Sequence, residues 1–152
     1  MSKGKIAIIG IGEVPTRTMP ERTHWDIIYD TCMEAVKDAG MSKNDIEGVI
    51  SVTPQAQPKI AAELSFGKLP EELGLKGCKD AVSVNAGGAS TSNAIRLAEQ
   101  WITSGVAKAV IVHHVTIHST IAVPDLINFF AKAGVDLQWE YPYGTTYNII
   151  MG

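Results

Sequence analysis

Long apolar runs, clusters of basic residues and closely spaced cysteines are all missing from this chain of 152 residues. A membrane-spanning helix needs roughly 18 to 20 consecutive apolar residues, and no run in the chain approaches that length. The strand-like stretch Ile6–Ile9 near the N-terminus is too short for the apolar part of a signal peptide. These absences predict a cytoplasmic protein without a membrane span.

The charge of the chain is low and evenly spread. The sequence holds 13 Lys and Arg against 16 Asp and Glu, for a net charge of −3. No basic cluster could follow a phosphate backbone, so we expect no nucleic-acid partner. Cys32 and Cys78 form no CxxC pair, which favours packed thiols over a disulfide or metal ligands. A chain of this length can bury one core.

Strand-like and helical patterns alternate along most of the chain. The strands carry little polar alternation, so they predict an α/β fold with a sheet covered by helices on both faces. We expect strands over 5–10, 48–52, 80–84 and 109–112, helices over 23–40, 58–66 and 88–104, and single turns over 42–45 and 69–73.

The first long helix has the clearest end signals. Thr23 is a good N-cap with Asp26 three residues later, and Gly40 suits the position after the last turn. By contrast, the chain ends inside an apolar, helix-like stretch that begins at Thr145 and has no cap. The expectation from this pattern is a truncated chain. Another helix is expected over 124–133.

The stretch Val84–Thr91 predicts a sharp turn from a strand into a long helix. Such an elbow directs the free N–H groups and the positive dipole end of the helix at a developing oxyanion or a thiol. Gly88 and Ala89 offer no nucleophile there, and spacing assigns no base to Ser90. Close strand–helix packing, which also needs small side chains, explains the same residues.

Two other motifs invite chemical interpretations. Gly10-Ile11-Gly12 resembles the start of a dinucleotide loop, but Pro15 takes the third glycine position and no helix opens at once. His113, His114 and His118 suggest a metal site, yet adjacent strand residues face opposite sides of a sheet. A hydrogen-bonded histidine, acting as acid, base or oxyanion donor, is the alternative for this position.

The elbow and the segment after it resemble the thiolase superfamily, in particular its sterol-carrier-protein-type and lipid-transfer-type branch. The family pattern is N-x-x-C-x-S-G-x-x-A, followed by a helix that ends in a small residue and glycine, and then by a strand. Asn85, Ser90 and Ala94 match this pattern, whereas Gly88 replaces the acylated cysteine and Thr91 replaces the glycine. Similar stretches lie at 8–12, 34–49 and 141–144, so the resemblance covers essentially the whole chain.

This resemblance implies a thiolase-like α/β fold, with an incomplete N-terminal βαβαβαβ half whose mixed sheet is covered by helices on both faces. Residues 1–118 would form its core, and residues 119–152 the start of a truncated loop or cap region. Complete thiolases have a second such half, which carries the catalytic histidine and a further cysteine. The fragment alone is therefore expected to be inactive.

The resemblance also implies a function in lipid metabolism. We expect an acyltransferase, or an enzyme that cleaves or forms a carbon–carbon bond in a β-keto- or β-hydroxyacyl-CoA, with the coenzyme A thioester as substrate and no covalently bound cofactor. The alternative is a non-catalytic acyl-CoA or lipid-binding subunit of a hetero-oligomer. The expected partners are a second copy, paired across residues 81–84, and a small zinc-ribbon/OB-fold protein.

Gly88 at the nucleophile position leaves the chemistry of the site unassigned. The resemblance places the substrate against the backbone of the elbow and the aromatic loop, with no metal. The expected substrate-binding residues are Gly87, Gly88, Ala89 and Tyr143, and the candidates for chemistry are Ser90, His113 and His118. The stretch Tyr141–Gly144 either lines a pocket for an acyl or aromatic group or packs on a neighbouring subunit.

Overall fold

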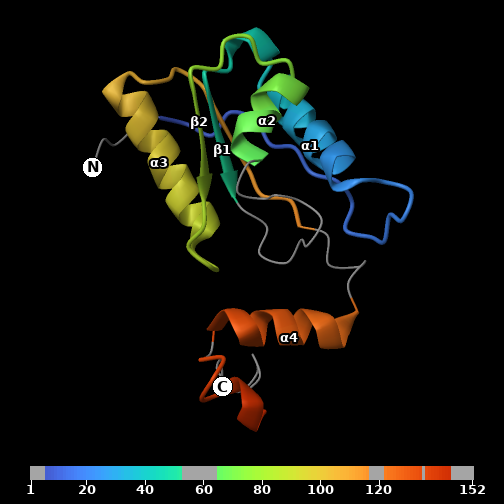
Figure 1. Cartoon of the computed structure of the whole chain (residues 1–152). Helices are drawn as coiled ribbons and strands as arrows, with labels where there is room; N and C mark the ends of the chain where they lie inside the picture. The colour runs from blue at the N-terminus through green and yellow to red at the C-terminus, as the bar shows by residue number, and fades with distance from the viewer. Residues whose placement is uncertain (1–5, 53–64, 117–121, 135, 145–152) are drawn as a thin grey trace. The chain divides into compact units, whose positions relative to one another are not determined.

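Three parallel strands organise the part of the chain that the computed structural model describes, which comprises residues 6–52, 65–116, 122–134 and 136–144. The strands are β1 (Gly48–Val52), β2 (Asp80–Val84) and β3 (Val110–His113), in the spatial order β2-β1-β3 (Figure 1). Two predicted strands are confirmed as they stand, and the last is shifted by one residue. The predicted sheet was mixed, but both pairings among these strands are parallel.

The strand predicted over 5–10 does not form within the described residues, and its glycines explain why. Residues 6–10 do not join the sheet, and residues 10–12 lie against a helix, α1 (His24–Asp38). A Cβ on Gly10 would lie 2.2 Å from the carbonyl oxygen of Ala35, and one on Gly12 would lie 1.9 Å from that of Thr31. The missing side chains therefore allow backbone-to-backbone contact with the helix.

Two side chains of α1 also accept hydrogen bonds from backbone N–H groups of the N-terminal segment. The Ile11 N–H donates to the Asp38 carboxylate at 2.9 Å, and the Glu13 N–H donates to Glu34 at 2.9 Å. Ile8, Ile9 and Ile11 are left exposed.

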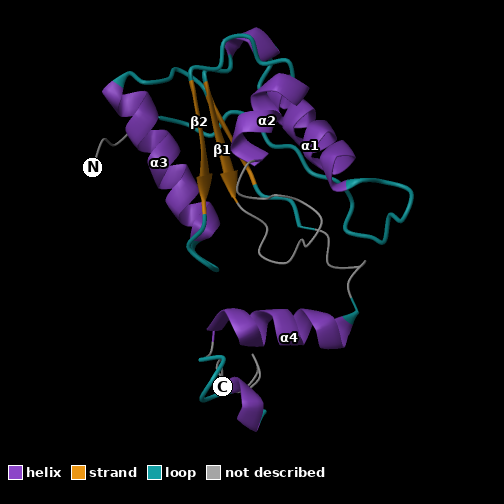
Figure 2. Cartoon of the chain, viewed as in Figure 1, coloured by secondary structure: helices purple, strands orange, loops and turns teal. Residues whose placement is uncertain are grey.

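Helices cover both faces of the sheet, as predicted. In Figure 2, α3 (Ser90–Ser104) lies on one side of the strands, and α1 and α2 (Ser65–Glu72) lie on the other. The cap predicted at Thr23 is present as a full capping box with Asp26. Gly105 ends α3 in the left-handed conformation at φ 80°.

The segment around Pro70 differs from its prediction. A single turn with Pro70 at its start was expected over 69–73, but Pro70 lies inside the two-turn helix α2. Proline lacks the N–H that would bond to the preceding turn, and burial of Leu69 and Leu73 at 1% exposure each stabilises the helix despite that loss. The helix predicted over 58–66 falls mostly outside the described residues.

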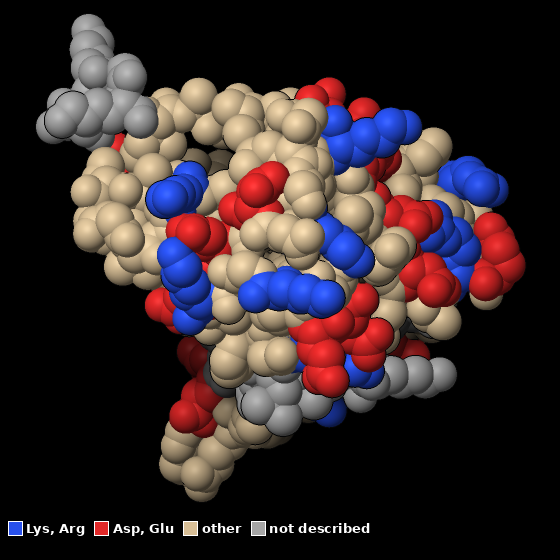
Figure 3. All heavy atoms as spheres, turned by 90° about the horizontal axis from the view of Figure 1, so that it is seen from above, with Lys and Arg blue, Asp and Glu red and all other residues tan. Residues whose placement is uncertain are grey.

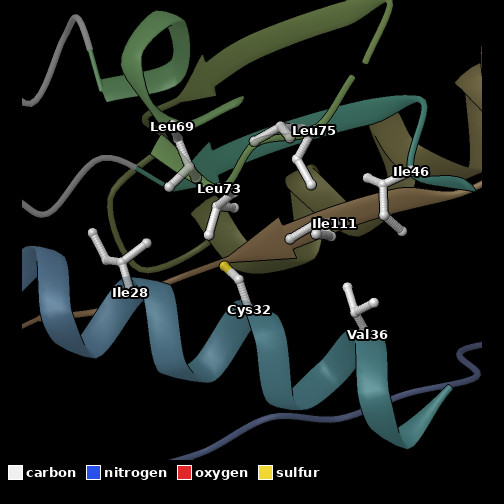
Figure 4. Close-up of a cluster of buried hydrophobic side chains, with 9 residues drawn as sticks. Ile28, Cys32, Val36, Ile46, Leu69, Leu73, Leu75 and Ile111 are labelled. Carbon is white, nitrogen blue, oxygen red and sulfur yellow. The ribbon is translucent and has the colours of Figure 1, made fainter. Parts of the chain in front are cut away.

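The larger core lies between α1, α2 and the sheet. Figure 4 shows Ile28, Cys32 and Val36 of α1 directed toward Leu73, Leu75 and Ile111. Cys32 is a free, buried thiol, and burial raises its pKa to about 12. The expectation of a packed thiol at this position is confirmed.

The second core lies under α3 and is smaller. Ile50 and Val52 of β1 pack there against Ala94 and Ala98, whose short side chains let the helix approach the sheet. Ile95 of α3, by contrast, is 45% exposed. Among its described residues, α3 is therefore buried along one face only.

Residues Thr116–Gly152 form a second compact unit, separate from Met1–Val115. It contains the predicted helix, α4 (Val123–Gly134), and a short 3-10 helix over Tyr141–Tyr143. The Lys132 ammonium lies 5.3 Å from the centre of the Tyr141 ring. The predicted boundary after residue 118 stays a prediction.

Charges of both signs are interspersed on the face shown in Figure 3. The described helices include none that combines the length and apolarity needed to cross a membrane.

We predict that Gly12→Ala destabilises the chain, because its Cβ would overlap the Thr31 carbonyl. The expected loss is about 1–3 kcal/mol in the free energy of unfolding, measured by urea denaturation. Gly67→Ala in α2 is the matched control, since a Cβ there meets nothing within 4 Å. That control should be neutral or stabilising by about 0.5–1 kcal/mol, and equal effects of the two variants would contradict the close approach.

Candidate functional site

The predicted elbow is present at the carboxyl end of β2. The chain turns through Gly87, which has φ 58°, and enters α3 at Ser90. The Ala89 N–H donates to the Ala86 carbonyl at 3.2 Å, and the Ser90 N–H donates to the Gly87 carbonyl at 3.1 Å. These two consecutive bonds fix the direction of the helix start.

Gly88 is not needed for packing. A Cβ built on it meets none of the described residues within 4 Å, and its φ is not in the left-handed region. The position therefore has room for a side chain, or for a ligand that approaches the backbone. Ala89 at the N-cap contributes no side-chain hydrogen bond to α3, so the positive end of this 15-residue helix is not neutralised by its own cap.

Ser90 holds the elbow together. Its hydroxyl donates to the Gly87 carbonyl at 2.6 Å and accepts from the Ala86 N–H at 2.8 Å. The residue is only 2% exposed. Both bonds tie the hydroxyl to the turn, which gives Ser90 a structural part in the site.

The side chain of His114, the residue after β3, lies near the start of α3. Its Nδ1 is 3.0 Å from Oγ1 of Thr91, in the first turn of the helix, and both side chains are exposed. The sequence named Thr91 only as a departure from the family pattern and did not connect it with His114. Because 23 positions separate the two residues, no local pattern could have joined them.

His113 faces the opposite side of the sheet from His114, as predicted for adjacent residues of a strand. Its Nε2 lies 2.8 Å from Oγ of Ser51 on β1, and its side chain is 7% exposed. Burial, together with the nearby His24 and His114, lowers the pKa of His113 to about 4. This ring is therefore neutral at neutral pH and is enclosed by protein.

Two further candidates belong to the second unit, Thr116–Gly152. His118 lies outside the described residues. Tyr143 is 83% exposed. Within the described ranges, no group of three His, Cys, Asp or Glu side chains could hold a metal ion.

The sequence matches no family model and no curated protein sequence at a significant level. The structure is similar to 3-oxoacyl-acyl-carrier-protein synthase III from Aquifex aeolicus VF5, with a TM-score of 0.52, 24% identity and coverage of 68% of this chain and 33% of that chain. It is also similar to the Ltp2-ChsH2(DUF35) aldolase, with a TM-score of 0.58, 20% identity and coverage of 91% and 33%.

These similarities define the class of fold. The chain has an α/β architecture of the thiolase-like kind, as the sequence predicted. It spans about a third of the length of either solved structure.

We predict that Ser90→Ala loosens the elbow. The substitution removes two hydrogen bonds, one from the Ala86 N–H and one to the Gly87 carbonyl, and this loss is expected to lower the free energy of unfolding by about 1–3 kcal/mol in urea denaturation. The exposed Ser92, two residues later, provides the control, and Ser92→Ala should change stability by less than about 0.5 kcal/mol. An unchanged midpoint for Ser90→Ala would show that the two bonds are dispensable.

Proposed function

We propose that the chain supplies the elbow of a thiolase-like enzyme that makes or breaks a carbon–carbon bond beside a coenzyme A thioester. The observation that carries this proposal is the open backbone at Gly88, in front of the uncapped N-terminus of α3. The names of both structural neighbours support it, since one is a 3-oxoacyl synthase and the other an aldolase.

The geometry of the elbow suits stabilisation of negative charge. During cleavage of a β-hydroxyacyl thioester, a base takes the proton of the β-hydroxyl and the bond between the α and β carbons breaks. The β carbon becomes a carbonyl, and the bonding electrons pass to the α carbon as a thioester enolate. A helix N-terminus next to the thioester oxygen stabilises that enolate, and a proton then returns to the α carbon.

Gly88 decides which route this elbow supports. It carries no side-chain nucleophile, so the elbow cannot form an acyl-enzyme through that residue. The retro-aldol route and its reverse need no such intermediate. We assign proton transfer to His114, because Thr91 positions its ring beside the first turn of α3.

Binding of the thioester tests the proposal directly. We expect acetyl-CoA to bind the full chain in isothermal titration calorimetry, and we expect Gly88→Leu to weaken binding by about tenfold or more because the new side chain fills the approach to the backbone. Gly67→Leu is the control, since position 67 is equally open but lies on α2.

Two outcomes of this titration would contradict the proposal. One is the absence of binding to the chain. The other is an equal loss of affinity in both leucine variants, because the elbow would then have no special role.

We also predict that Gly88→Cys creates a reactive thiol. Stability should change by less than about 1 kcal/mol, because the Cβ meets no atom. The dipole of α3 should lower the pKa of the new thiol, so iodoacetamide should modify it faster than the thiol of Gly67→Cys, as followed by mass spectrometry. Equal rates for the two thiols would show that the elbow does not activate a nucleophile.

A non-catalytic acyl-CoA-binding subunit is the second candidate, and the absence of a nucleophile at Gly88 favours it. This function also predicts binding, so turnover separates the two. Release of a carbonyl product from a β-hydroxyacyl-CoA supports the enzyme, whereas binding without product by the assembled complex supports the binding subunit. The name of the DUF35-containing neighbour suggests a hetero-oligomer, and a homodimer through β2 is proposed from the family resemblance.

A further inference from the structure

A buried polar row crosses the α1 side of the sheet, on the opposite face from the elbow helix. Ser51 is in register with Ser83 of β2 and with His113 of β3. Residues opposite one another on neighbouring strands point to the same face. Two residues earlier on β1 and β3, Val49 and Ile111 belong to the core under α1. The row is therefore set into an apolar environment.

His24, the first residue of α1, lies near this row. Its side chain is 8% exposed, and its Nε2 is 2.8 Å from the carbonyl oxygen of Val115. A carbonyl only accepts, so Nε2 carries the hydrogen and Nδ1 of the neutral ring is an acceptor. The bond joins the start of α1 to the last residue of the first unit.

Each ring has one buried nitrogen that has no partner among the described residues. These atoms are Nδ1 of His24 and Nδ1 of His113, and each is closed off from solvent. Protonation would place a positive charge and, on His24, a new unpaired N–H in this apolar environment. His24 also lies at the positive end of α1, which disfavours a second positive charge.

The surrounding charges do not compensate a proton on either ring. Within the described part of the chain, neither ring contacts a carboxylate. On α1, the Asp26 carboxylate accepts from Thr23. On α2, Lys68 and Glu72 pair with each other at 3.3 Å. His114 follows His113 on the third strand and, with His24, further disfavours its protonation.

We propose that His24 and His113 make the contact between α1 and the segment after β3 acid-sensitive: the bond between His24 and Val115 holds the start of α1 while both rings are neutral and opens when either ring is protonated. Opening releases Val115, after which the chain leaves the first unit. The contact thus links acidification to the attachment of Val115 to the start of α1. This inference does not depend on the proposed function.

The sign of the pH effect follows from the lowered pKa values. Burial lowers the pKa of both histidines, to about 4 for His113. Above their ordinary pKa of 6.5, the closed and open states bind the same number of protons. As the pH falls below that value, only the open state gains protons, so the closed state is lost progressively until the pH reaches the pKa of the closed state.

Hydrogen exchange of the full chain at about pH 7.5 and about pH 5 tests the contact. After correction for intrinsic exchange, opening of the first turn of α1 should increase roughly 30-fold for a histidine that stays neutral in the closed state. β1 should stay protected. Both His113→Asn and His24→Gln should reduce this acid response, whereas Ser92→Ala, at an exposed position of α3, should retain it. Carboxylates contribute little in this range because they titrate mainly at lower pH.

Two results would overturn the proposal. One is an unchanged acid response in both His113→Asn and His24→Gln. The other is an equal increase of exchange in β1, which indicates global unfolding. Should the variants fail to fold, NMR titration of the unaltered chain decides: ring signals of His24 and His113 that titrate below about pH 5.5 support the contact, and signals that titrate at their ordinary pKa refute it.

Discussion

The double pairing of β1 is the constraint on which the first unit depends. This strand is hydrogen-bonded along both edges, and all five of its residues are buried. Its start is fixed by Glu47, whose carboxylate accepts from the Lys79 ammonium at 2.7 Å and from the Lys108 N–H at 2.9 Å. These contacts lower the pKa of the Glu47 carboxyl. One residue thereby sets the register of both outer strands.

Parallel pairing around β1 brings chemically different residues to one edge of the sheet. The elbow follows β2, and the adjacent His113 and His114 occur where β3 ends. The alternation of side chains along β3 then separates the two histidines into unlike environments. His114 is exposed beside α3 and can exchange protons with solvent, whereas His113 is enclosed on the α1 side.

Local signals in the sequence predicted the elements that depend on near neighbours in the chain. Thr23 and Asp26 form a cap across three residues, and Gly105 supplies the left-handed end of α3. The strand predicted over 5–10 was wrong for residues 6–10, because a short apolar run carries no information about its neighbours in the fold. In the structure, the Ile11 N–H bonds to α1, and the close approach of Gly10 and Gly12 to that helix is a tertiary contact.

The candidate site shows the same division between local and long-range information. The turn at Gly87 and the absence of a nucleophile at Gly88 follow from the sequence. The pairs Thr91–His114 and Ser51–His113 do not, because 23 and 62 positions separate their members. The role of Ser90 was also out of reach, since its hydroxyl bonds are visible only once the turn is folded.

The contrast between Gly88 and Gly12 has an evolutionary consequence. Substitution of Gly12 by a larger residue requires α1 to move, so the helix and this segment must change together. Substitution of Gly88 requires no other residue of the described chain to move. A side chain can therefore be gained or lost at this elbow in a single mutational step, without a compensating change among the described residues.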